Sequence, residues 1–397
     1  APGGQVAAQV YPRDHEDRLF VPGVSAEVRM DPALRREELE GSMAVAYRAT
    51  AGPGRLALVL GAANISSIGP MDALYKLFVE NRVVLYKMHP LNEELAPLIE
   101  EGFQPLVSLG ALRVVRGGGR IGSALCRHPD VDEIHITGSD RTVEAIVFGE
   151  GSEGERRKAE GRLLLHKPVS SELGNVSPVI VVPGDWSRGE LSYQARHLAT
   201  MLAHNAGCNC NTARVLVQKR GWAGGEDLLA ALETVLASLP SRRAYYPGAE
   251  ERHRRFLESH PGARTLGEPA TGALPWTLVP GLDPTAEDEP CFRREAFCPL
   301  TAETSLEAND LPGFLERAVD FCNEKLWGTL NATLVVSRAT LRRPGVTAAL
   351  ERALDRLRYG TVAVNQWAGV GYALVTPPWG AFPGHTLEDI QSGTGVV

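Results

Sequence analysis

The stretch Arg55-Leu56-Ala57-Leu58-Val59-Leu60-Gly61 decides the fold class. A continuous apolar run closed by a glycine indicates a strand buried on both faces, and such strands occur mainly in parallel sheets. Segments of helical and extended pattern then alternate along the chain, with helices expected over 70–80, 92–101 and 121–128 and strands over 83–86, 112–115 and 133–136. This alternation predicts right-handed crossovers and a Rossmann-like, doubly wound α/β domain.

A second α/β pattern follows a charged, glycine-rich connection over 151–161. We expect strands over 179–182, 214–218, 332–336 and 362–364, and helices over 192–205, 226–239, 312–323 and 347–358. Near the start, residues 4–30 hold two alternating apolar runs around a polar turn, which predict a hairpin or a pair of extended arms. Residues 31–48 predict a polar helix. The predicted parts are a hairpin or oligomerisation arm (1–30), the Rossmann-like domain (31–172), a second domain (173–375) and a C-terminal return segment (376–397).

Composition limits the kind of protein. The 397 residues, 44% of them hydrophobic, suffice for two packed domains. The formal charge is -7 and no clustered basic stripe is present, so a nucleic-acid partner is not expected. The six cysteines lack the spacing of a disulfide scaffold, and no apolar run is long enough to span a membrane. These features favour a cytoplasmic protein without a membrane partner.

The loops after the first-domain strands carry polar residues. Ligands of doubly wound sheets bind at the carboxyl ends of the strands. Asn64 follows the first strand, Lys87 ends the second, and Thr137-Gly138-Ser139 follows the fourth and opens a helix. A serine there is equally well explained as a plain N-cap or as part of a phosphate site. The G-x-G-x-x-G spacing at 117–122 follows the third strand rather than the first, so we interpret it as a turn near a bound dinucleotide.

A thiol-bearing turn lies at His204-Asn205-Ala206-Gly207-Cys208-Asn209-Cys210-Asn211-Thr212-Ala213-Arg214. We interpret Cys210, at the tip between a helix and a strand, as a nucleophile. Taken alone, an inert packed thiol is the commoner explanation. His204, Cys208 and Cys210 without a distant fourth ligand make a poor zinc site, so no metal is expected. Cys208 is interpreted as packing, with a reversible redox partner as the alternative.

Glu172 lies in a predicted loop of small residues over 172–178, where it could act as a base. Considered by itself, the residue is better explained as an ordinary surface glutamate. Its importance comes from the other residues described next.

The ordered set resembles the aldehyde dehydrogenase superfamily from about Arg55 to the end. Its members are Asn64, Lys87, Thr137-Gly138-Ser139, Glu172-Leu173-Gly174, Cys210, Glu295-Ala296-Phe297-Cys298-Pro299 and Asn365. The 38 positions between residues 172 and 210 are close to the spacing in that family. Each motif is modest alone, and their joint order is highly specific. The resemblance implies a cofactor domain, a catalytic domain and a small hairpin for oligomerisation.

The resemblance also implies NAD(P)-dependent oxidation of an aldehyde to a carboxylic acid. Cys210 would form a thiohemiacetal and then a thioester, with Asn64 and the Cys210 N–H stabilising the oxyanion. Glu172 would activate the hydrolytic water. Cofactor contacts would come from Lys87, Gly138, Ser139, Glu295 and Phe297, which match the family's positions.

Departures from the family pattern are informative. Pro90 stands where many NAD-using members carry an acid, so NADP is permitted alongside NAD, with Arg116 or Arg120 as contacts for its 2′-phosphate. The Pro-Trp preceding the family's asparagine is Ala62-Ala63 here, and Asn175 and Cys298 replace glycines. We expect altered loop geometry at these positions.

Alternatives stay open. A CoA-acylating reductase of the same fold would not need Glu172, and a cofactor-binding homologue could have lost turnover. Trp367, Tyr372 and Trp379 lie in late loops, where an aromatic substrate entry and simple packing are equally good explanations. The family's usual N-terminal helical region is not evident, so we expect a trimmed chain or an unusual member. A homodimer is the first expectation for assembly.

Overall fold

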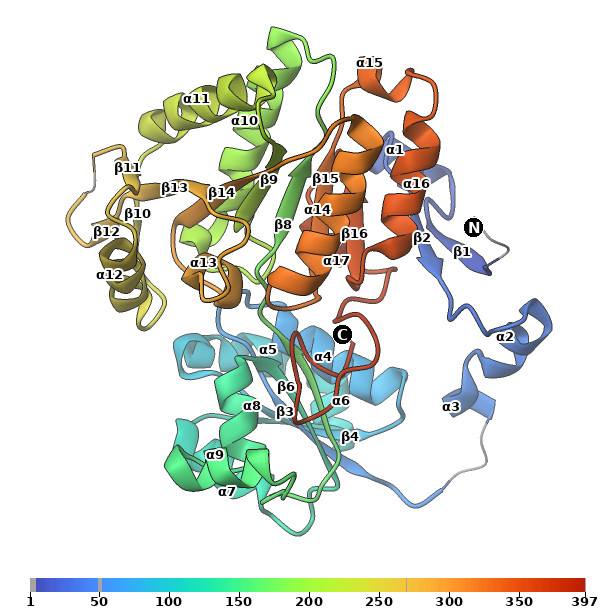
Figure 1. The fold of residues 1–397 in the computed structure, drawn as a ribbon. Coiled ribbons are helices and arrows are strands. Elements are labelled where there is room, and N and C mark those ends of the chain that lie inside the picture. The colour runs from blue at the N-terminus through green and yellow to red at the C-terminus, as the bar shows by residue number, and fades with distance from the viewer. Residues whose placement is uncertain (1–4, 49–51, 269, 397) are drawn as a thin grey trace. The chain divides into compact units, whose positions relative to one another are not determined.

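The computed structural model describes residues 5–48, 52–268 and 270–396 (Figure 1). The chain divides into two compact units, Ala1–Leu173 with Leu374–Val397, and Gly174–Ala373. Each unit has a sheet and hydrophobic clusters of its own.

The first unit contains the predicted Rossmann-like sheet. Its strands are β3 (Leu56–Leu60), β4 (Val83–Lys87), β5 (Leu112–Val115), β6 (Glu133–Gly138) and β7 (Val169–Leu173). Their order is β5-β4-β3-β6-β7, and every neighbouring pair is parallel. The connecting elements are α4 (Ile68–Phe78), the 3₁₀ helix η2 (Pro90–Leu95), α5 (Ala96–Gly102), α6 (Gln104–Leu109), α7 (Gly119–Cys126), α8 (Asp140–Val147) and α9 (Gly151–Ala159). The doubly wound fold is therefore confirmed.

Alternating side chains of one strand serve both faces of this sheet. Val59 packs in a cluster with Ala73 of α4 and Ala96 of α5, whereas its neighbour Leu58 packs with Cys126 of α7. Successive strand residues point to opposite faces, so a strand covered by helices on both sides must be apolar throughout. This explains the uninterrupted run that predicted the fold.

Three local predictions in this unit are wrong. The supposed connection over 151–161 forms α9, and the single helix expected over 92–101 is divided into η2 and α5. Glu172 lies in strand β7 and not in a loop. The sequence of this strand, Val-Ser-Ser-Glu-Leu, is too polar to have predicted a buried strand.

The N-terminal arm is an antiparallel pair, β1 (Ala7–Tyr11) with β2 (Ala26–Arg29). Helix α1 (His15–Phe20) occupies much of the connection between the strands. The first residue of the predicted hairpin, residue 4, lies outside the described residues, as do residues 1–3. The polar helix expected over 31–48 is two helices, α2 (Arg36–Ser42) and α3 (Val45–Arg48), and Ala44 between them has a φ of 51°.

The second unit is built on a larger sheet. Its order is β11-β13-β14-β9-β8-β15-β16, and all pairs are parallel except β11 with β13. The strands are β8 (Pro178–Val181), β9 (Val215–Lys219), β11 (Arg264–Leu266), β13 (Trp276–Leu282), β14 (Leu300–Leu306), β15 (Asn331–Val335) and β16 (Thr361–Val364), beside a small pair, β10 (Arg242–Arg243) and β12 (Ala273–Leu274). The sequence did not predict β13, whose run is broken by Pro280 and Gly281, or the polar β14.

Helices cover both faces of this sheet (Figure 1). One hydrophobic cluster joins α10 (Arg188–Ala203) and α11 (Ala223–Ser238) to one face, and another joins α14 (Leu311–Lys325) and α16 (Val346–Arg356) to the other. The shorter elements are η3 (His204–Gly207), α12 (Ala249–Ser259), α13 (Pro290–Arg293), α15 (Arg338–Leu341) and α17 (Gly369–Ala373). The predicted second α/β domain is thereby confirmed as a fold.

The last segment of the chain returns to the first unit. The Leu173 N–H donates to Ser392 O at 2.8 Å, and Glu172 and Gly393 form an antiparallel bridge. Gly393 has a φ of +112°, and a Cβ there would lie 2.0 Å from Ser171 O. A glycine is therefore required at this position for the segment to lie against the edge of β7.

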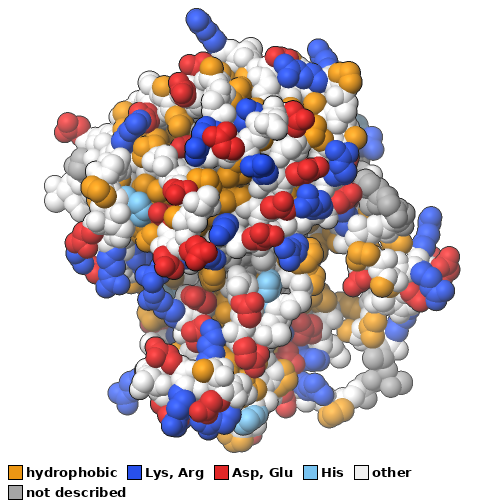
Figure 2. Space-filling view, viewed as in Figure 1, with side chains coloured by type: hydrophobic (Ala, Val, Ile, Leu, Met, Phe, Trp, Pro, Cys, Tyr) orange, Lys and Arg blue, Asp and Glu red, His pale blue; other side chains and the backbone are white. Residues whose placement is uncertain are grey.

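Basic and acidic side chains are interspersed on the face shown in Figure 2. None of the helices in the described ranges is both long enough and apolar enough to cross a lipid bilayer.

Candidate active site

The predicted site residues of the first unit lie at one edge of its sheet. Asn64 follows the carboxyl end of β3, Lys87 ends β4, Ser139 follows β6, and Glu172 is next to last in β7. Because these strands are parallel, their carboxyl ends share that edge, where ligands of doubly wound sheets bind.

Lys87 is nearly buried at the end of β4, at 7% exposure. Burial lowers the pKa of its amine, and the charge of Glu93 opposes this effect. The Glu93 carboxylate also accepts the Gly117 N–H at 2.5 Å. Gly117 has a φ of +129°, and a Cβ there would meet the Ile121 side chain at 2.7 Å. The first glycine of the G-x-G-x-x-G spacing thus forms a tight turn, which a hydrogen bond to Glu93 holds next to η2.

Ser139 is the N-cap of α8. Its Oγ accepts the Thr142 N–H at 3.3 Å and lies 2.9 Å from Thr142 Oγ1. Gly138 and Ser139, at the N-terminus of α8, are both exposed. The capping role is confirmed, and it is compatible with an anion at the same helix end.

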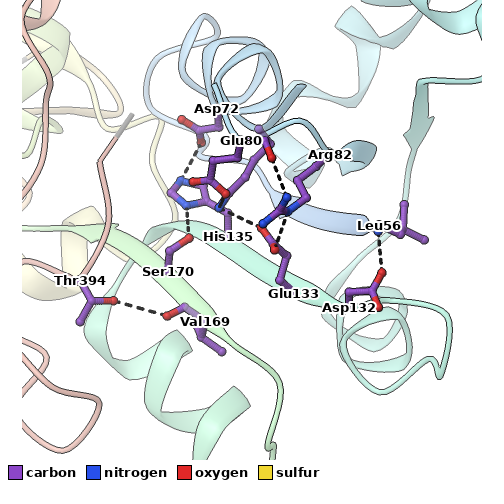
Figure 3. A network of polar contacts seen from close by, with 11 residues as sticks. Leu56, Asp72, Glu80, Arg82, Asp132, Glu133, His135, Val169, Ser170 and Thr394 are labelled. Carbon is purple, nitrogen blue, oxygen red and sulfur yellow. Dashed lines mark hydrogen bonds and ion pairs between the residues drawn. The ribbon is translucent and has the colours of Figure 1, made fainter. Parts of the chain in front are cut away.

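Thr137, two positions before Ser139, contacts a set of buried polar residues that includes Asp72 and His135 (Figure 3). Thr137 donates to Asp72 Oδ2 at 2.9 Å, and the His135 Nε2 atom lies 3.7 Å from the same oxygen. The other ring nitrogen of His135 contacts Ser170 Oγ at 2.8 Å. Burial raises the pKa of Asp72 to about 7 and lowers that of His135 to about 3. Between those pH values both groups are neutral, so the pair is not a salt bridge.

Glu172 is only 2% exposed, so its interpretation as a surface glutamate is wrong. The Trp379 indole N–H donates to Glu172 Oε1 at 3.3 Å. Trp379 is itself 3% exposed, which confirms packing rather than a place at an open substrate entry. The carboxylate is held on a strand by the returning C-terminal segment.

In the second unit, Cys210 lies on the loop between η3 and β9. Among the six cysteines, all in described positions, Cys210 alone is not buried. Its carbonyl oxygen accepts Ser177 Oγ–H at 3.0 Å and the Asn331 side-chain amide at 3.3 Å. Burial raises the pKa of Cys208 to about 11 and that of Cys298 to about 12, so both neighbours stay protonated near neutral pH.

Arg214 holds the Cys210 loop against the segment around residue 298. The guanidinium is 3% exposed and donates to Cys298 O at 2.8 Å and Leu300 O at 3.1 Å. It also donates to Gly207 O and Asn209 O, on the loop itself. Burial lowers the pKa of Arg214. Several aligned carbonyl groups compensate this buried cation, which makes the loop rigid.

The Glu295–Phe297 segment is likewise fixed by close contacts. A Cβ on Gly174 would lie 2.0 Å from Glu295 Oε2, so only glycine permits the carboxylate to approach here. Phe297 has a φ of 43°, and its ring lies 4.7 Å from that of Tyr246. Arg252 donates to Phe297 O at 3.0 Å, and Cys208 Sγ donates to the same oxygen at 3.5 Å. The Cys210 loop and this segment are therefore neighbours.

Other motif residues have structural partners in the second unit. The Asn365 side chain pairs with both backbone groups of Val336, at 2.8 and 3.0 Å. Asn175, which replaces a family glycine, donates to Asn331 O at 2.8 Å. Trp367 donates to Asn211 O at 2.7 Å, directly beside the Cys210 turn.

The predicted set falls into two groups. Asn64, Lys87, Gly138, Ser139 and Glu172 belong to the first unit, and Cys210, Glu295 and Phe297 belong to the second. Sequence reasoning named Arg214 and Trp379 but did not predict that Arg214 supports the Cys210 loop or that Trp379 bonds to Glu172. A charged residue directly before the apolar run 215–217 was the one available signal for Arg214.

Comparisons with known proteins agree with these features. The model of the aldehyde dehydrogenase family matches residues 73–244. A curated relative, 4-trimethylaminobutyraldehyde dehydrogenase B of Danio rerio, is 27% identical over 252 residues, 57% of this chain and 44% of the relative. The chain thus spans less than half the length of the curated relatives it matches.

Solved structures share the fold over most of the chain. Mycobacterium tuberculosis aldehyde dehydrogenase complexed with NAD+ has a TM-score of 0.62 and 21% identity, covering 86% of this chain and 65% of that one. NADP-dependent glyceraldehyde-3-phosphate dehydrogenase from Bacillus halodurans C-125, complexed with NADP, has a TM-score of 0.63 and 19% identity over the same shares. In its matched segment over residues 73–244, in its fold and in its motif residues, the chain is similar to the aldehyde dehydrogenase superfamily.

Proposed function

We propose that this chain oxidises an aldehyde to a carboxylic acid with NAD or NADP, using Cys210 as the nucleophile. The observation that carries the proposal is the setting of Cys210. Among the six cysteines it alone is not buried, and it lies on a loop that Arg214 holds beside the segment of Glu295 and Phe297. A rigid loop next to backbone amides suits a thiolate that must attack a carbonyl.

Each step has a candidate residue. The Cys210 sulfur bonds to the carbonyl carbon, and the resulting oxyanion accepts hydrogen bonds from the Asn64 amide and the Cys210 N–H. The bound nicotinamide supplies the acceptor for the hydride that leaves this carbon. Glu172 takes a proton from water, whose oxygen attacks the thioester and releases the acid and the Cys210 thiol. The burial of Glu172 on a strand supports its role as a positioned base.

The first unit has residues suited to a nicotinamide dinucleotide. The partly desolvated Lys87 amine and the N-terminus of α8, where Gly138 and Ser139 are exposed, suit its hydroxyl and phosphate groups. Pro90 brings no carboxylate to oppose a 2′-phosphate, and Arg116 and Arg120, in the segment after the neighbouring strand β5, are exposed. One of the two solved structures above holds NAD+ and the other NADP, so either cofactor is proposed.

The test is a turnover assay with purified chain. A panel of aldehydes that includes 4-trimethylaminobutyraldehyde is supplied with NAD or NADP, with and without CoA, and reduced nicotinamide is followed by absorbance. Cys210→Ala is the inactive variant and Cys208→Ala its matched control. We expect acid formation that does not depend on CoA and is abolished only by the first substitution.

Other outcomes separate the alternatives. Product formed only as an acyl-CoA would indicate the CoA-acylating reaction. Cofactor binding by calorimetry, without reduction on any aldehyde, would leave a binding protein and refute the proposed turnover. Loss of activity in Cys208→Ala with activity retained in Cys210→Ala would overturn the assignment of the nucleophile.

We also propose a homodimer formed through the β1–β2 arm and a cytoplasmic location. Leu19 and Phe20 of α1, at the end of this arm, are 70% and 80% exposed, which supports an interface there. Six free thiols suit a reducing compartment. Light scattering of wild type against Phe20→Glu tests the interface, because a monomeric wild type would contradict it.

A further inference from the structure

Three side chains with metal-ligating atoms, none of them in the set predicted from the sequence, converge in the second unit. His260 is the C-cap of α12, Glu289 is the N-cap of α13, and Cys291 lies in the first turn of α13. The distance from His260 Nε2 to Glu289 Oε1 is 2.8 Å, and that from His260 Nε2 to Cys291 Sγ is 3.8 Å. All three ligand atoms lie within 4.8 Å of one another.

The imidazole is oriented as in a metal-binding histidine. Its Nδ1 lies 2.6 Å from Phe256 O, one turn earlier on α12, and the Phe256 ring stacks on it at 6.4 Å and 14°. A backbone carbonyl on one ring nitrogen fixes the proton there and leaves Nε2 aimed at the carboxylate and the sulfur. This arrangement is the usual support of a histidine ligand.

The separations suit a small tetrahedral ion. Usual zinc–ligand lengths imply a sulfur–nitrogen edge of about 3.5 Å and a nitrogen–oxygen edge of about 3.3 Å. The His260–Cys291 distance of 3.8 Å would shorten by about 0.3 Å, and the His260–Glu289 distance of 2.8 Å would lengthen by about 0.5 Å. Rotations of the side chains can produce changes of this size without a shift of the backbone.

The surroundings favour retention of an ion. Cys291 is 4% exposed and His260 is 8% exposed, whereas Glu289 keeps some contact with solvent. Exclusion of water around the buried Cys291 and His260 strengthens their bonds to a metal ion. The ion can enter past the partly exposed Glu289 carboxylate. Thiolate and imidazole donors select zinc or a similar transition metal over magnesium or calcium.

We propose that His260, Glu289 and Cys291 bind one zinc-class divalent ion, with a water molecule as fourth ligand. The ion binds Nε2, one carboxylate oxygen and Sγ, and Cys291 gives up its thiol proton to solvent. It ties the end of α12 to the start of α13, the short helix just before the Glu295 segment. The competing explanation is a His260–Glu289 ion pair with a bystander thiol.

Cobalt spectroscopy of the full chain separates these explanations. Co²⁺ serves as a spectroscopic substitute for zinc. Bound to a thiolate, it gives a charge-transfer band in the near ultraviolet. It also gives absorption bands in the visible, whose strength indicates tetrahedral geometry. We expect one equivalent of Co²⁺ per chain to saturate both signals, and added zinc to remove them by displacing the cobalt. Cys291→Ala should lose the charge-transfer band. Cys322→Ala, which removes another buried thiol of this unit, and Cys210→Ala, which removes the half-buried one, should keep it.

A second pair of variants guards against misfolding. His260→Gln should weaken cobalt binding at least about tenfold. His253→Gln changes a buried histidine on the same helix, bonded to Thr277, and should leave binding unchanged. In parallel, zinc should raise the melting temperature of wild type and His253→Gln but not of His260→Gln.

The proposal is overturned if wild type shows no charge-transfer band at saturating cobalt. It is equally overturned if the band survives in Cys291→Ala or vanishes in Cys210→Ala, since the ion would then be held elsewhere. No aldehyde or nicotinamide enters the experiment, so its outcome is independent of the proposed dehydrogenase activity.

Discussion

Asp72 and His135 allow a quantitative test of the first unit, because between about pH 4 and pH 6.5 burial keeps each of them neutral where the same group in water is charged. With a pKa of about 7, the Asp72 carboxyl keeps its proton where an unfolded aspartate, near 3.8, has lost it. With a pKa of about 3, His135 stays neutral where an unfolded histidine, near 6.5, is protonated.

Each group therefore binds a different number of protons in the native and unfolded states. One proton of difference changes the free energy of unfolding by about 1.4 kcal/mol per pH unit. Asp72 holds its extra proton in the native state, so its contribution falls as the pH rises from about 4 to about 7. His135 is protonated only when unfolded, so its contribution rises from about pH 3 to about pH 6.5. The two slopes cancel between about pH 4 and pH 6.5.

Asp72→Asn removes the pH dependence that Asp72 gives to the free energy of unfolding, so that of His135 is no longer cancelled. Relative to wild type, the free energy of unfolding of the variant should rise by about 1.4 kcal/mol per pH unit, or by about 3.5 kcal/mol between pH 4 and pH 6.5. The measurement is urea unfolding at several pH values, with β3, β4 and β6 followed by a short deuterium-exchange pulse at one fixed pH. Asp130→Asn, an exposed acid whose side chain is 79% accessible, is the control and should parallel wild type. Parallel curves for Asp72→Asn and wild type would refute a protonated Asp72.

Three further predictions concern the second unit and the returning segment. Arg214→Met should lower the free energy of unfolding by about 3 kcal/mol or more, because it leaves buried carbonyl groups unsatisfied; urea unfolding should show little change for the exposed Arg220→Met. Gly393→Ala should cost at least about 2 kcal/mol, from its φ of +112° and a 2.0 Å clash with β7, and wild-type stability in the same assay would contradict the close approach. Cys210→Ala should reduce turnover at least about 1,000-fold with cofactor affinity retained, whereas a similar loss in Cys208→Ala would exclude the proposed nucleophile.

The sequence predicted those parts of the fold whose cause is local. The strand over 112–115 has the predicted bounds, because its apolar residues are flanked by clear turn residues. Strand β14 could not be found in this way, since Thr301, Glu303 and Ser305 are polar residues in a strand whose pairing comes from β9 and β13. Its burial depends on neighbours that are distant along the chain.

The same distinction holds for the candidate site. The order of motif residues predicted the members, including Glu172 and Cys210, whose roles stay predictions. The support of these residues is non-local: Trp379 reaches Glu172 across 207 positions, and Arg214 reaches Cys298 across 84. The cluster of His260, Glu289 and Cys291 escaped notice for a related reason, because its histidine stands 29 positions from the carboxylate.

The discontinuous make-up of the first unit has a consequence for biosynthesis. Residues 374–397 complete the edge of β7 and cover Glu172, yet they leave the ribosome only after the whole of Gly174–Ala373 has been made. At about 5–20 residues per second, these roughly 200 residues take about 10–40 s to translate. During that interval the nascent sheet presents β7 as an open edge strand, with its backbone groups available for wrong pairing. Chaperone dependence during translation should therefore be concentrated in this window, and should end when the returning segment emerges.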